Sequence, residues 1–192
     1  VIPDVTMVAC PRAAAMAGFG RIMFADCGHD LNVDLDDLSS SLRHEDGGRI
    51  PVAMCMAVHV YGRRVNMNRL QESVKPSFLI EDLAEAHGVE VHGGTDAACW
   101  SFYKNKIVAG HEGGAVWFKN KEHADLVKRL RSLGMNPDNH DFMHHPRGHN
   151  YRMSDIHAQP ILKSLELFTE NVRMRKSVID EYVQLMPKQL LV

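Results

Sequence analysis

The stretch SFLIEDLAEAHGVEVHGGTDAACWSF at residues 77–102 is the part of the sequence that decides the fold class. Its two apolar runs, Ser77–Ile80 and Ala97–Phe102, predict short strands, because they alternate poorly, as strands covered on both faces do. Between them, Glu81–His87 predicts a helix that Gly88 would end. Apolar runs that alternate with helical segments are typical of an α/β domain with a mostly parallel sheet flanked by helices.

The same alternation extends in both directions from this stretch. The further elements expected are strands at Ile22–Ala25, Pro51–Val60 and Ala115–Phe118, and helices at Asp34–Leu42, Asn66–Val74 and Lys121–Leu133. The opening VIPDVTMVA at 1–9 reads as the end of a strand that enters a loop. We expect three parts: an α/β core over 1–134, an irregular loop rich in His and Asn over 135–153, and a helical region over 154–192 that begins at Ser154.

Composition and charge narrow the class of protein. The chain has 192 residues, of which 45% are hydrophobic and 24% charged, so a globular rather than a disordered protein is expected. Lys and Arg number 22 against 24 Asp and Glu, and the net charge of -2 gives no electrostatic reason to expect a nucleic acid or an anionic membrane as partner. The longest apolar run, Ile50–Val58, is far shorter than a membrane-spanning helix.

The cysteines and the two ends of the sequence indicate the compartment of the protein and whether the sequence is part of a longer chain. The four cysteines contain no CxxC pair, so free thiols are expected rather than disulfides or a zinc site. No signal peptide opens the sequence, and a reducing cytoplasmic setting is therefore the expectation. The first residue is not Met and the last residues are apolar, so we expect that both ends were trimmed or that the chain is part of something longer.

Three polar residues stand where chemistry is expected, because ligands of open parallel sheets bind beyond the carboxyl ends of the strands. Asp82 closely follows the apolar run at 77–80, and a carboxylate there is costly to bury unless it meets a cation or hydrogen-bond donors. Lys106 lies just past the strand expected at 97–102, and a lysine in a crowded cleft can act as a nucleophilic amine. Ser101 offers a hydroxyl on the same segment.

Each of these residues also has a simpler interpretation. Asp82, with its neighbour Glu81, could cap the helix expected after it. A lone lysine in a loop is more often a solvated charge than a catalyst. The glycines of GHEGG at 110–114 make an ordinary turn as readily as a phosphate-binding loop, since neither the GxGxxG nor the Walker spacing is present.

Three longer segments favour the functional interpretation of these residues over the simpler one. They are IEDLAEAHG at 80–88, WSFYKNKIVAGHEGGAVWF at 100–118 and HNYRMSDIHAQPIL at 149–162. In order and spacing they resemble the DegT/StrS family of nucleotide-sugar aminotransferases, which depend on pyridoxal 5'-phosphate (PLP). The resemblance covers essentially the whole chain and is nearest to the perosamine-synthase-like branch. It implies the large domain of a fold-type I PLP-dependent transferase, incomplete here because family members are about twice as long.

The resemblance implies roles around the ring of the cofactor. Lys106 matches the lysine that binds PLP covalently and moves protons between the substrate and the cofactor. Asp82 matches the carboxylate that pairs with the pyridine nitrogen, which keeps the ring an effective electron sink. Glu85, expected on the same helical face as Asp82, matches a polar group near the ring hydroxyl. Met7 falls where many relatives place an aromatic residue against the ring face, and a thioether can pack there too.

The resemblance also implies the phosphate ligands and the reaction. Ser101 matches a serine that binds the cofactor phosphate, and Asn150 matches an asparagine that reaches this phosphate from the neighbouring subunit of a homodimer. His59 lies near the site and is a weak candidate for contact with the substrate. The implied reaction transfers an amino group from an amino acid such as glutamate to a nucleotide-linked keto sugar. The family segment Gly-Thr-Ala, which also binds the phosphate, has no counterpart in this sequence.

Alternatives to an active aminotransferase remain open at this point. The chain could be a non-catalytic remnant that dimerises, or a partial subunit that needs a second chain. A PLP-dependent sugar dehydratase ranks lower, because those relatives carry histidine in place of the lysine at 106. A metal-binding loop built from His140, Asp141, His144, His145 and His149 is a further alternative, although no specific metal site is expected. The basic run RMRK at 173–176 reads as a solvated helix face.

Overall fold

A computed structural model describes residues 1–135, 144 and 147–187. The chain divides into two compact units. The first comprises Val1–Trp100 and Ala115–Arg152, and the second comprises Ser101–Gly114 and Met153–Val192. The expected loop over 135–153 lies largely outside the described residues, because 136–143, 145 and 146 are among those left out.

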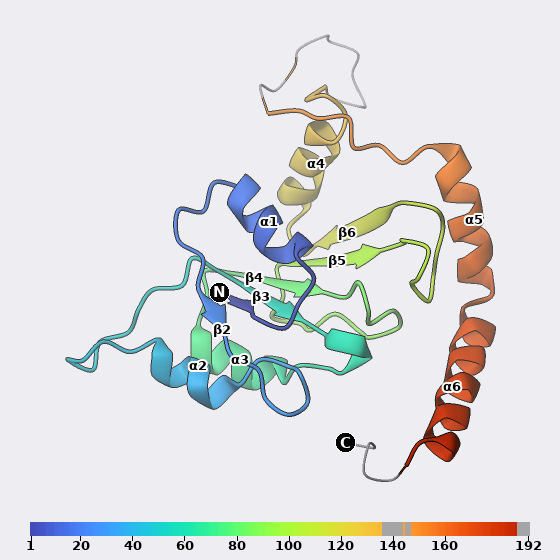
Figure 1. Cartoon of the computed structure of the whole chain (residues 1–192). Coiled ribbons are helices and arrows are strands. Elements are labelled where there is room, and N and C mark those ends of the chain that lie inside the picture. Colours follow the sequence, from blue (N-terminus) through green and yellow to red (C-terminus); the bar gives the residue numbers. More distant parts are fainter. Residues whose placement is uncertain (136–143, 145–146, 188–192) are drawn as a thin grey trace. The chain divides into compact units, whose positions relative to one another are not determined.

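The first unit is built on a four-stranded sheet in the order β3-β4-β5-β6 (Figure 1). The strands are β3 (Met54–Val58), β4 (Phe78–Asp82), β5 (Ala97–Ser101) and β6 (Gly114–Phe118). β3, β4 and β5 are parallel to one another. Backbone hydrogen bonds join Lys119 to Asp96 and Phe102 to Gly113, a pairing that gives β6 an antiparallel direction. The expected α/β class with a mostly parallel sheet is confirmed.

Two short strands extend this sheet beyond β3. β1 (Ile2–Pro3) and β2 (Phe24–Ala25) form a parallel pair. The amino group of Val1 donates to the carbonyl oxygen of Met54, and the N–H of Met56 donates to the carbonyl oxygen of Val1. These hydrogen bonds place β1 directly beside β3, so the strand expected at the start of the chain is confirmed.

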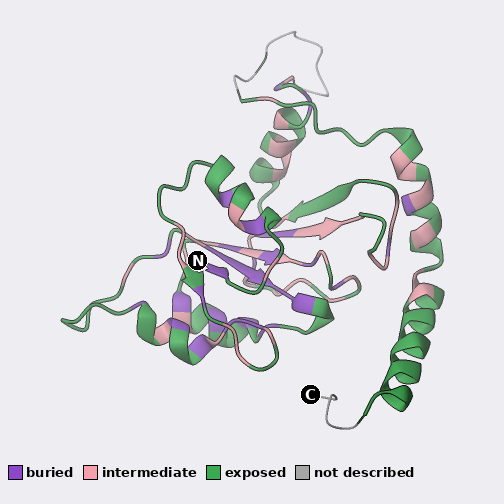
Figure 2. Ribbon diagram, viewed as in Figure 1, coloured by how far each residue is buried: buried purple, intermediate pink, exposed green. Residues whose placement is uncertain are grey.

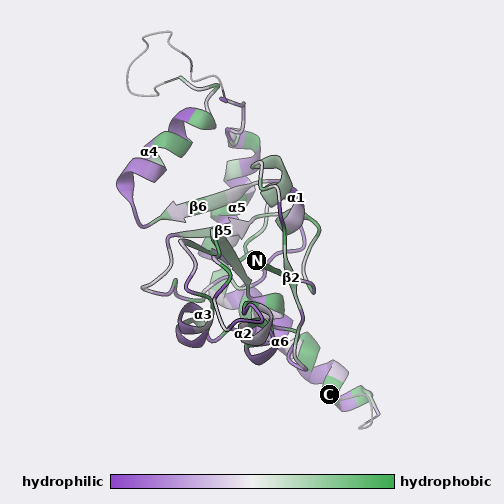
Figure 3. Ribbon diagram, turned by 90° about the vertical axis from the view of Figure 1, so that its left-hand side faces the viewer, coloured by the Kyte–Doolittle hydropathy of each residue, from purple (hydrophilic) through white to green (hydrophobic). Residues whose placement is uncertain are grey.

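Helices cover both faces of the sheet in the first unit. α2 (Leu35–Ser41) and α3 (Met67–Val74) lie on one side, and α1 (Ala9–Met16) lies on the other (Figures 1 and 3). Successive residues of β3 supply the two cores: Cys55 and Ala57 pack with α2 and α3, whereas Met56 and Val58 pack with α1. This alternation buries β3 on both faces, as Figure 2 shows, and explains its continuous apolar sequence.

The remaining helices differ between the units. α4 (Lys121–Leu130) follows β6 in the first unit and begins at Asn120, whose side chain accepts a hydrogen bond from the N–H of Glu122. The short 3₁₀ helix η1 (Val60–Gly62) follows β3. In the second unit, α5 (Asp155–Glu166) and α6 (Phe168–Leu185) carry mostly exposed side chains (Figure 2). None of the described helices has the length and apolar content to cross a membrane.

One expected helix is absent, and one observed helix was not expected. The helix expected at Glu81–His87 is absent: β4 continues through Asp82, and turns follow it. The N–H of Ala84 donates to Asp82 Oδ1, a local side-chain bond that competes with helical hydrogen bonding. α1 was not anticipated, although its run of alanines and Pro11 near its start favour a helix.

Candidate active site

Asp82 is the last residue of β4, the strand between β3 and β5. Both of its carboxylate oxygens accept hydrogen bonds. The N–H of Ala84 donates to Oδ1 at 2.9 Å, and the thiol of Cys10 on α1 donates to Oδ2 at 3.1 Å. Both donors are neutral, so neither cancels the negative charge of this half-buried carboxylate. The arrangement suits a cationic ligand group at the end of the strand.

Cys10 connects Asp82 to the segment that precedes α1. The hydroxyl of Thr6 donates to Cys10 Sγ at 3.1 Å, while the Cys10 thiol itself points to Asp82. Burial is the main cause that raises the pKa of the Cys10 thiol to about 12; the Thr6 hydroxyl bond lowers this pKa, and the nearby Asp82 carboxylate raises it. Cys10 therefore remains a protonated, neutral donor to Asp82.

The Asp82→Asn variant is expected to increase the alkylation rate of Cys10 by iodoacetamide about threefold to tenfold at mildly alkaline pH. Removing the carboxylate charge lowers the pKa of the thiol, so a larger fraction is present as the reactive thiolate. Peptide mapping by mass spectrometry measures the rate at each cysteine.

Cys55 is the internal control for this experiment. Burial raises the pKa of Cys55 to about 11 without a contribution from Asp82, so its alkylation reports only general opening of the fold. Equal rates at Cys10 in the variant and in the unaltered chain, with Cys55 unchanged, would contradict the contact between Cys10 and Asp82.

A fully buried polar network lies directly beside Asp82. His59 Nε2 lies 2.9 Å from Glu81 Oε2, and neither side chain has exposed surface. The other carboxylate oxygen of Glu81, Oε1, accepts hydrogen bonds from the hydroxyl of buried Thr95 and from the N–H of His92. The network ties the chain after β3 and the loop before β5 to the end of β4.

Hydrogen bonding sets the protonation of this network. The N–H of Val65 donates to His59 Nδ1 at 3.1 Å, so the proton of the imidazole lies on Nε2 and points to Glu81. Burial opposes ionisation of Glu81, but the hydrogen bonds from His59, Thr95 and His92 outweigh it and hold the pKa of Glu81 below its ordinary value. The pair is therefore a carboxylate with a neutral imidazole.

These contacts change the interpretation of two residues. His59, a weak substrate candidate from the sequence, is fully buried and has a structural partner. Its backbone N–H also donates to the carbonyl oxygen of Asp82. Glu81 and Cys10 were not recognised as important from the sequence. The signal for Glu81 was its position directly after the strand predicted at 77–80, where a buried carboxylate needs partners to be stable.

Glu85 lies in a turn and not on the helical face expected for it. Its Oε2 accepts a hydrogen bond from the N–H of Tyr61 at 3.0 Å. Tyr61 has a positive φ of 53°, and Gly62 follows with a φ of 79°. The Glu85 carboxylate thus stabilises a strained turn after β3 and stays exposed on the surface of the first unit.

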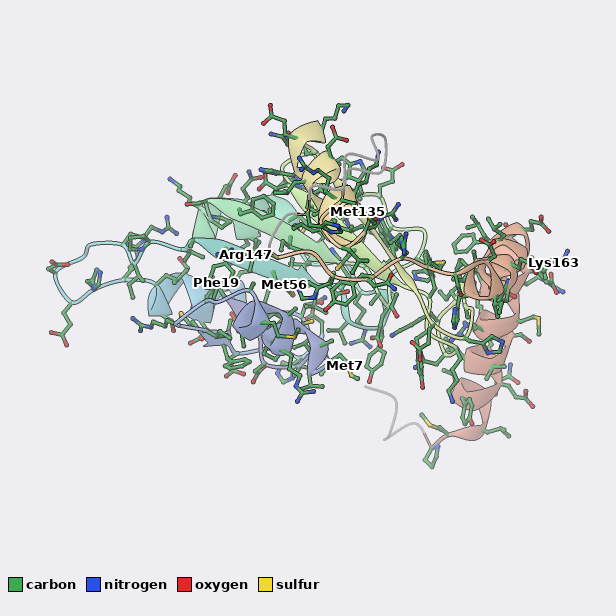
Figure 4. The ribbon with its side chains drawn as sticks, turned by 90° about the horizontal axis from the view of Figure 1, so that it is seen from above. Met7, Phe19, Met56, Met135, Arg147 and Lys163 are labelled. Atoms are coloured by element: carbon green, nitrogen blue, oxygen red, sulfur yellow. The ribbon has the colours of Figure 1, made fainter. Side chains whose placement is uncertain are left out.

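Met7 and Asn150 also belong to the first unit. Met7 precedes α1, and its side chain is 71% exposed, in contrast to the buried Met56 (Figure 4). Asn150 forms an isolated antiparallel bridge with Ser132, and its side-chain oxygen accepts from Arg152 Nε at 3.5 Å. Both residues are exposed on the first unit.

Ser101 and Lys106 belong to the second unit. Ser101 is the last residue of β5, and its hydroxyl accepts a hydrogen bond from the N–H of Tyr103. Lys106 lies in the loop that follows, and its backbone N–H donates to the carbonyl oxygen of Tyr103. A cavity of about 280 Å³ within this unit is lined by Lys106, by its loop neighbours and by residues of α5 and α6.

A metal centre receives no support from the residues that can be described. Within 1–135, 144 and 147–187, no group of three His, Cys, Asp or Glu side chains is arranged to hold a metal ion. His144 Nδ1 lies 2.9 Å from the carbonyl oxygen of Leu133, and the His149 ring stacks on Tyr151. His140, Asp141 and His145 lie outside the described residues.

Comparison with known proteins assigns the chain to a family. The sequence profile of the DegT/DnrJ/EryC1/StrS aminotransferase family matches residues 1–189. This chain belongs to that family. The assignment confirms the resemblance seen in the three sequence segments, and PLP is accordingly the expected cofactor.

Relatives of the DegT/DnrJ/EryC1/StrS family are similar along nearly the whole chain. A GDP-perosamine synthase of Caulobacter vibrioides is 29% identical over 191 residues, which cover 96% of this chain and 50% of the relative. A dTDP-3-amino-3,4,6-trideoxy-alpha-D-glucose transaminase of Micromonospora megalomicea is 31% identical and covers 95% of this chain and 49% of the relative. The chain thus spans about half the length of the relatives it matches.

The fold agrees with solved structures of the family. The sugar aminotransferase CalS13 of Micromonospora echinospora superposes with a TM-score of 0.77 at 22% identity, over 95% of this chain and 53% of that protein. At this identity the likeness concerns the fold. The residues present fit PLP chemically, since Asp82 is an anion held by neutral donors and suits a protonated ring nitrogen.

Proposed function

We propose that this chain is the PLP-binding part of an aminotransferase that acts on a nucleotide-linked keto sugar and takes its amino group from an amino acid such as glutamate. The observation that carries the proposal is the Asp82 carboxylate at the end of β4, held by the neutral donors Ala84 N–H and Cys10 Sγ. Membership of the aminotransferase family supports the same conclusion. We assign 1–134 to the PLP-binding core and 154–192 to a helical region that leads towards a small domain.

Five residues would hold the cofactor besides Lys106. Asp82 would keep the ring nitrogen protonated, and the Cys10 thiol would orient its carboxylate for this task. Exposed Met7 would pack on the ring face, and Glu85 would lie near the ring hydroxyl. The hydroxyl of Ser101 and the side-chain amide of Asn150 of the partner subunit would bind the phosphate.

Lys106 would carry the chemical steps performed by the protein. Its amine would attach the cofactor covalently before the amino acid arrives, and would then be free to accept the proton from Cα of the amino acid. The same amine would return the proton at the carbon that accepts the amino group. PLP, when bound, supplies the electron sink that stabilises the negative charge left by the proton.

The proposed function is tested by mixing the 192-residue chain with PLP and then with L-glutamate. Conversion of bound PLP to pyridoxamine phosphate, followed by absorbance, is the expected result. Cofactor binding that appears only after co-expression with a second polypeptide of the family would instead establish a partial subunit. Failure to bind PLP under both conditions would leave a non-catalytic protein and overturn the proposal.

We also infer a homodimer and a cytoplasmic location. Exposed apolar side chains on α6, among them Ile179 and Tyr182, support an interface that covers this helix. All four cysteines are free, which suits a reducing compartment. Sedimentation velocity measures the first inference, and a monomer at micromolar concentration would contradict it.

A further inference from the structure

The loop between Phe102 and Gly110 is held by hydrogen bonds within itself and by hydrogen bonds from α5 and α6. The N–H of Lys106 donates to Tyr103, and the N–H of Gly110 donates to Phe102. The carbonyl oxygens of residues 105, 106 and 107 accept hydrogen bonds from side chains of α5 and α6. The position of the Lys106 backbone therefore depends on these helices.

Arg175 on α6 makes the two contacts nearest to Lys106. Its Nη2 donates to the carbonyl oxygen of Asn105 at 2.8 Å and to that of Lys106 at 2.9 Å. Hydrogen bonds from a charged donor are stronger than neutral ones, and the planar guanidinium holds its donors in a fixed direction. One side chain thus holds two consecutive carbonyl groups.

Asn171 and Ser164 hold the next part of the loop. Asn171 Nδ2 donates to the carbonyl oxygen of Ile107 at 3.1 Å and to Ser164 Oγ at 3.3 Å. The hydroxyl of Ser164 accepts the N–H of Ala109 at 3.0 Å. The contacts of Arg175, Asn171 and Ser164 together satisfy four backbone groups of the loop: the carbonyl groups of 105, 106 and 107 and the N–H of 109.

The helical spacing separates the two residues that hold the loop, Asn171 and Arg175, from Arg173. Asn171 and Arg175 are four residues apart and share one face of α6. Arg173 belongs to another face, where its Nε and Nη2 donate to the Glu170 carboxylate. The run at 173–176, expected to be a solvated face, is exposed as expected, and Arg175 also binds the loop from this exposed position.

We propose that Arg175 and Asn171 are positioning residues for Lys106. By holding the backbone at 105–107, they fix the point from which the Lys106 amine reaches the cofactor and the substrate proton. The inference rests on the proposed function of Lys106. Small displacements of a reacting group can slow a reaction about 100-fold, so loss of these contacts reduces the rate although no catalytic group is removed.

The test compares four variants of the 192-residue chain: Arg175→Ala, Arg175→Lys, Asn171→Ala and the control Arg173→Ala. The control removes the same charge from the same helix without touching the loop. Hydrogen–deuterium exchange of the peptide over 103–110 needs no cofactor and is expected to be about tenfold faster in Arg175→Ala and Asn171→Ala. Arg175→Lys retains one charged donor and should fall between Arg175→Ala and the unaltered chain.

The second measurement follows the covalent attachment of PLP, trapped by borohydride at successive times. We expect a rate about tenfold lower in Arg175→Ala, and a lower kcat with an unchanged KM for the keto sugar. Attachment at equal rates in Arg175→Ala, Asn171→Ala and the unaltered chain would overturn the positioning role. Absence of attachment in the unaltered chain, both alone and after co-expression with a second polypeptide of the family, would overturn the proposed function itself, so the two failures are distinguishable.

Discussion

Replacing Lys106 by alanine is expected to abolish the covalent attachment of PLP to this chain. No other residue is proposed to supply the amine, so the loss should be complete and not partial. Borohydride reduction after incubation with PLP, followed by intact-mass measurement, reports the attachment directly. Any amino-transfer activity should fall about 100-fold to 10,000-fold, the range expected when a group that moves a proton is removed.

Lys104 provides the matched control for this experiment. It lies two residues before Lys106 in the same loop, and its amine is 5.7 Å from the centre of the Tyr103 ring. The Lys104→Ala variant should attach PLP as the unaltered chain does. A mass increase that persists in Lys106→Ala, or that disappears in Lys104→Ala, would assign the attachment to a different lysine.

Glu81→Ala is expected to lower the free energy of unfolding by about 3–5 kcal/mol. The substitution leaves His59 with an unpaired Nε2–H and removes the acceptor of Thr95 and of the His92 N–H, all at a fully buried site. Urea denaturation followed by circular dichroism measures the change. The exposed Glu72 on α3 is the control, and Glu72→Ala should change the free energy by less than about 0.5 kcal/mol.

Glu81→Gln distinguishes the hydrogen-bond pattern from simple packing. The N–H of Val65 keeps His59 Nδ1 unprotonated, so the Nε2 proton would face the amide NH₂ group of a glutamine. This conflict should cost about 1–3 kcal/mol although the shape is unchanged. A Glu81→Gln variant as stable as the unaltered chain would show that the histidine tautomer is not fixed as described.

The contribution of Glu81 also depends on pH in a defined direction. Its pKa is lower in the folded chain than in the unfolded chain, because the bonds from His59, Thr95 and His92 outweigh the effect of burial. The stabilisation is therefore present above the ordinary pKa of a glutamate and is lost as the pH falls through the lowered value. The stability gap between the unaltered chain and Glu81→Gln should narrow in that acidic range.

Local sequence patterns were sufficient for the class of fold. The apolar runs around Cys55, Leu79 and Ala98 predicted buried parallel strands, and the structure confirms them because each is covered on both faces. The capping residues Asp34 and Asn66 similarly marked helix starts through short-range hydrogen bonds. Such features depend on neighbours within a few residues and can therefore be predicted from the amino-acid sequence.

Local sequence patterns predicted the wrong secondary structure where pairing with distant strands determined the conformation. Glu81–His87 has helical composition, but Asp82 completes β4 by pairing with Val58 and Cys99, and its side chain then binds the N–H of Ala84. The energy of strand pairing outweighs the weak helical preference of a short segment. The local sequence alone does not show that strand pairing competes with helix formation at this segment.

By itself, the sequence determined the fold class, the family and the identities of Asp82, Ser101 and Lys106 as candidate residues. Only the tertiary structure decided which groups support them: Cys10 for Asp82, and Arg175 with Asn171 for the loop of Lys106. The physical reason is distance along the chain. Cys10 and Asp82 are 72 residues apart, and Arg175 and Lys106 are 69 apart, so each contact exists only after folding has brought their elements together.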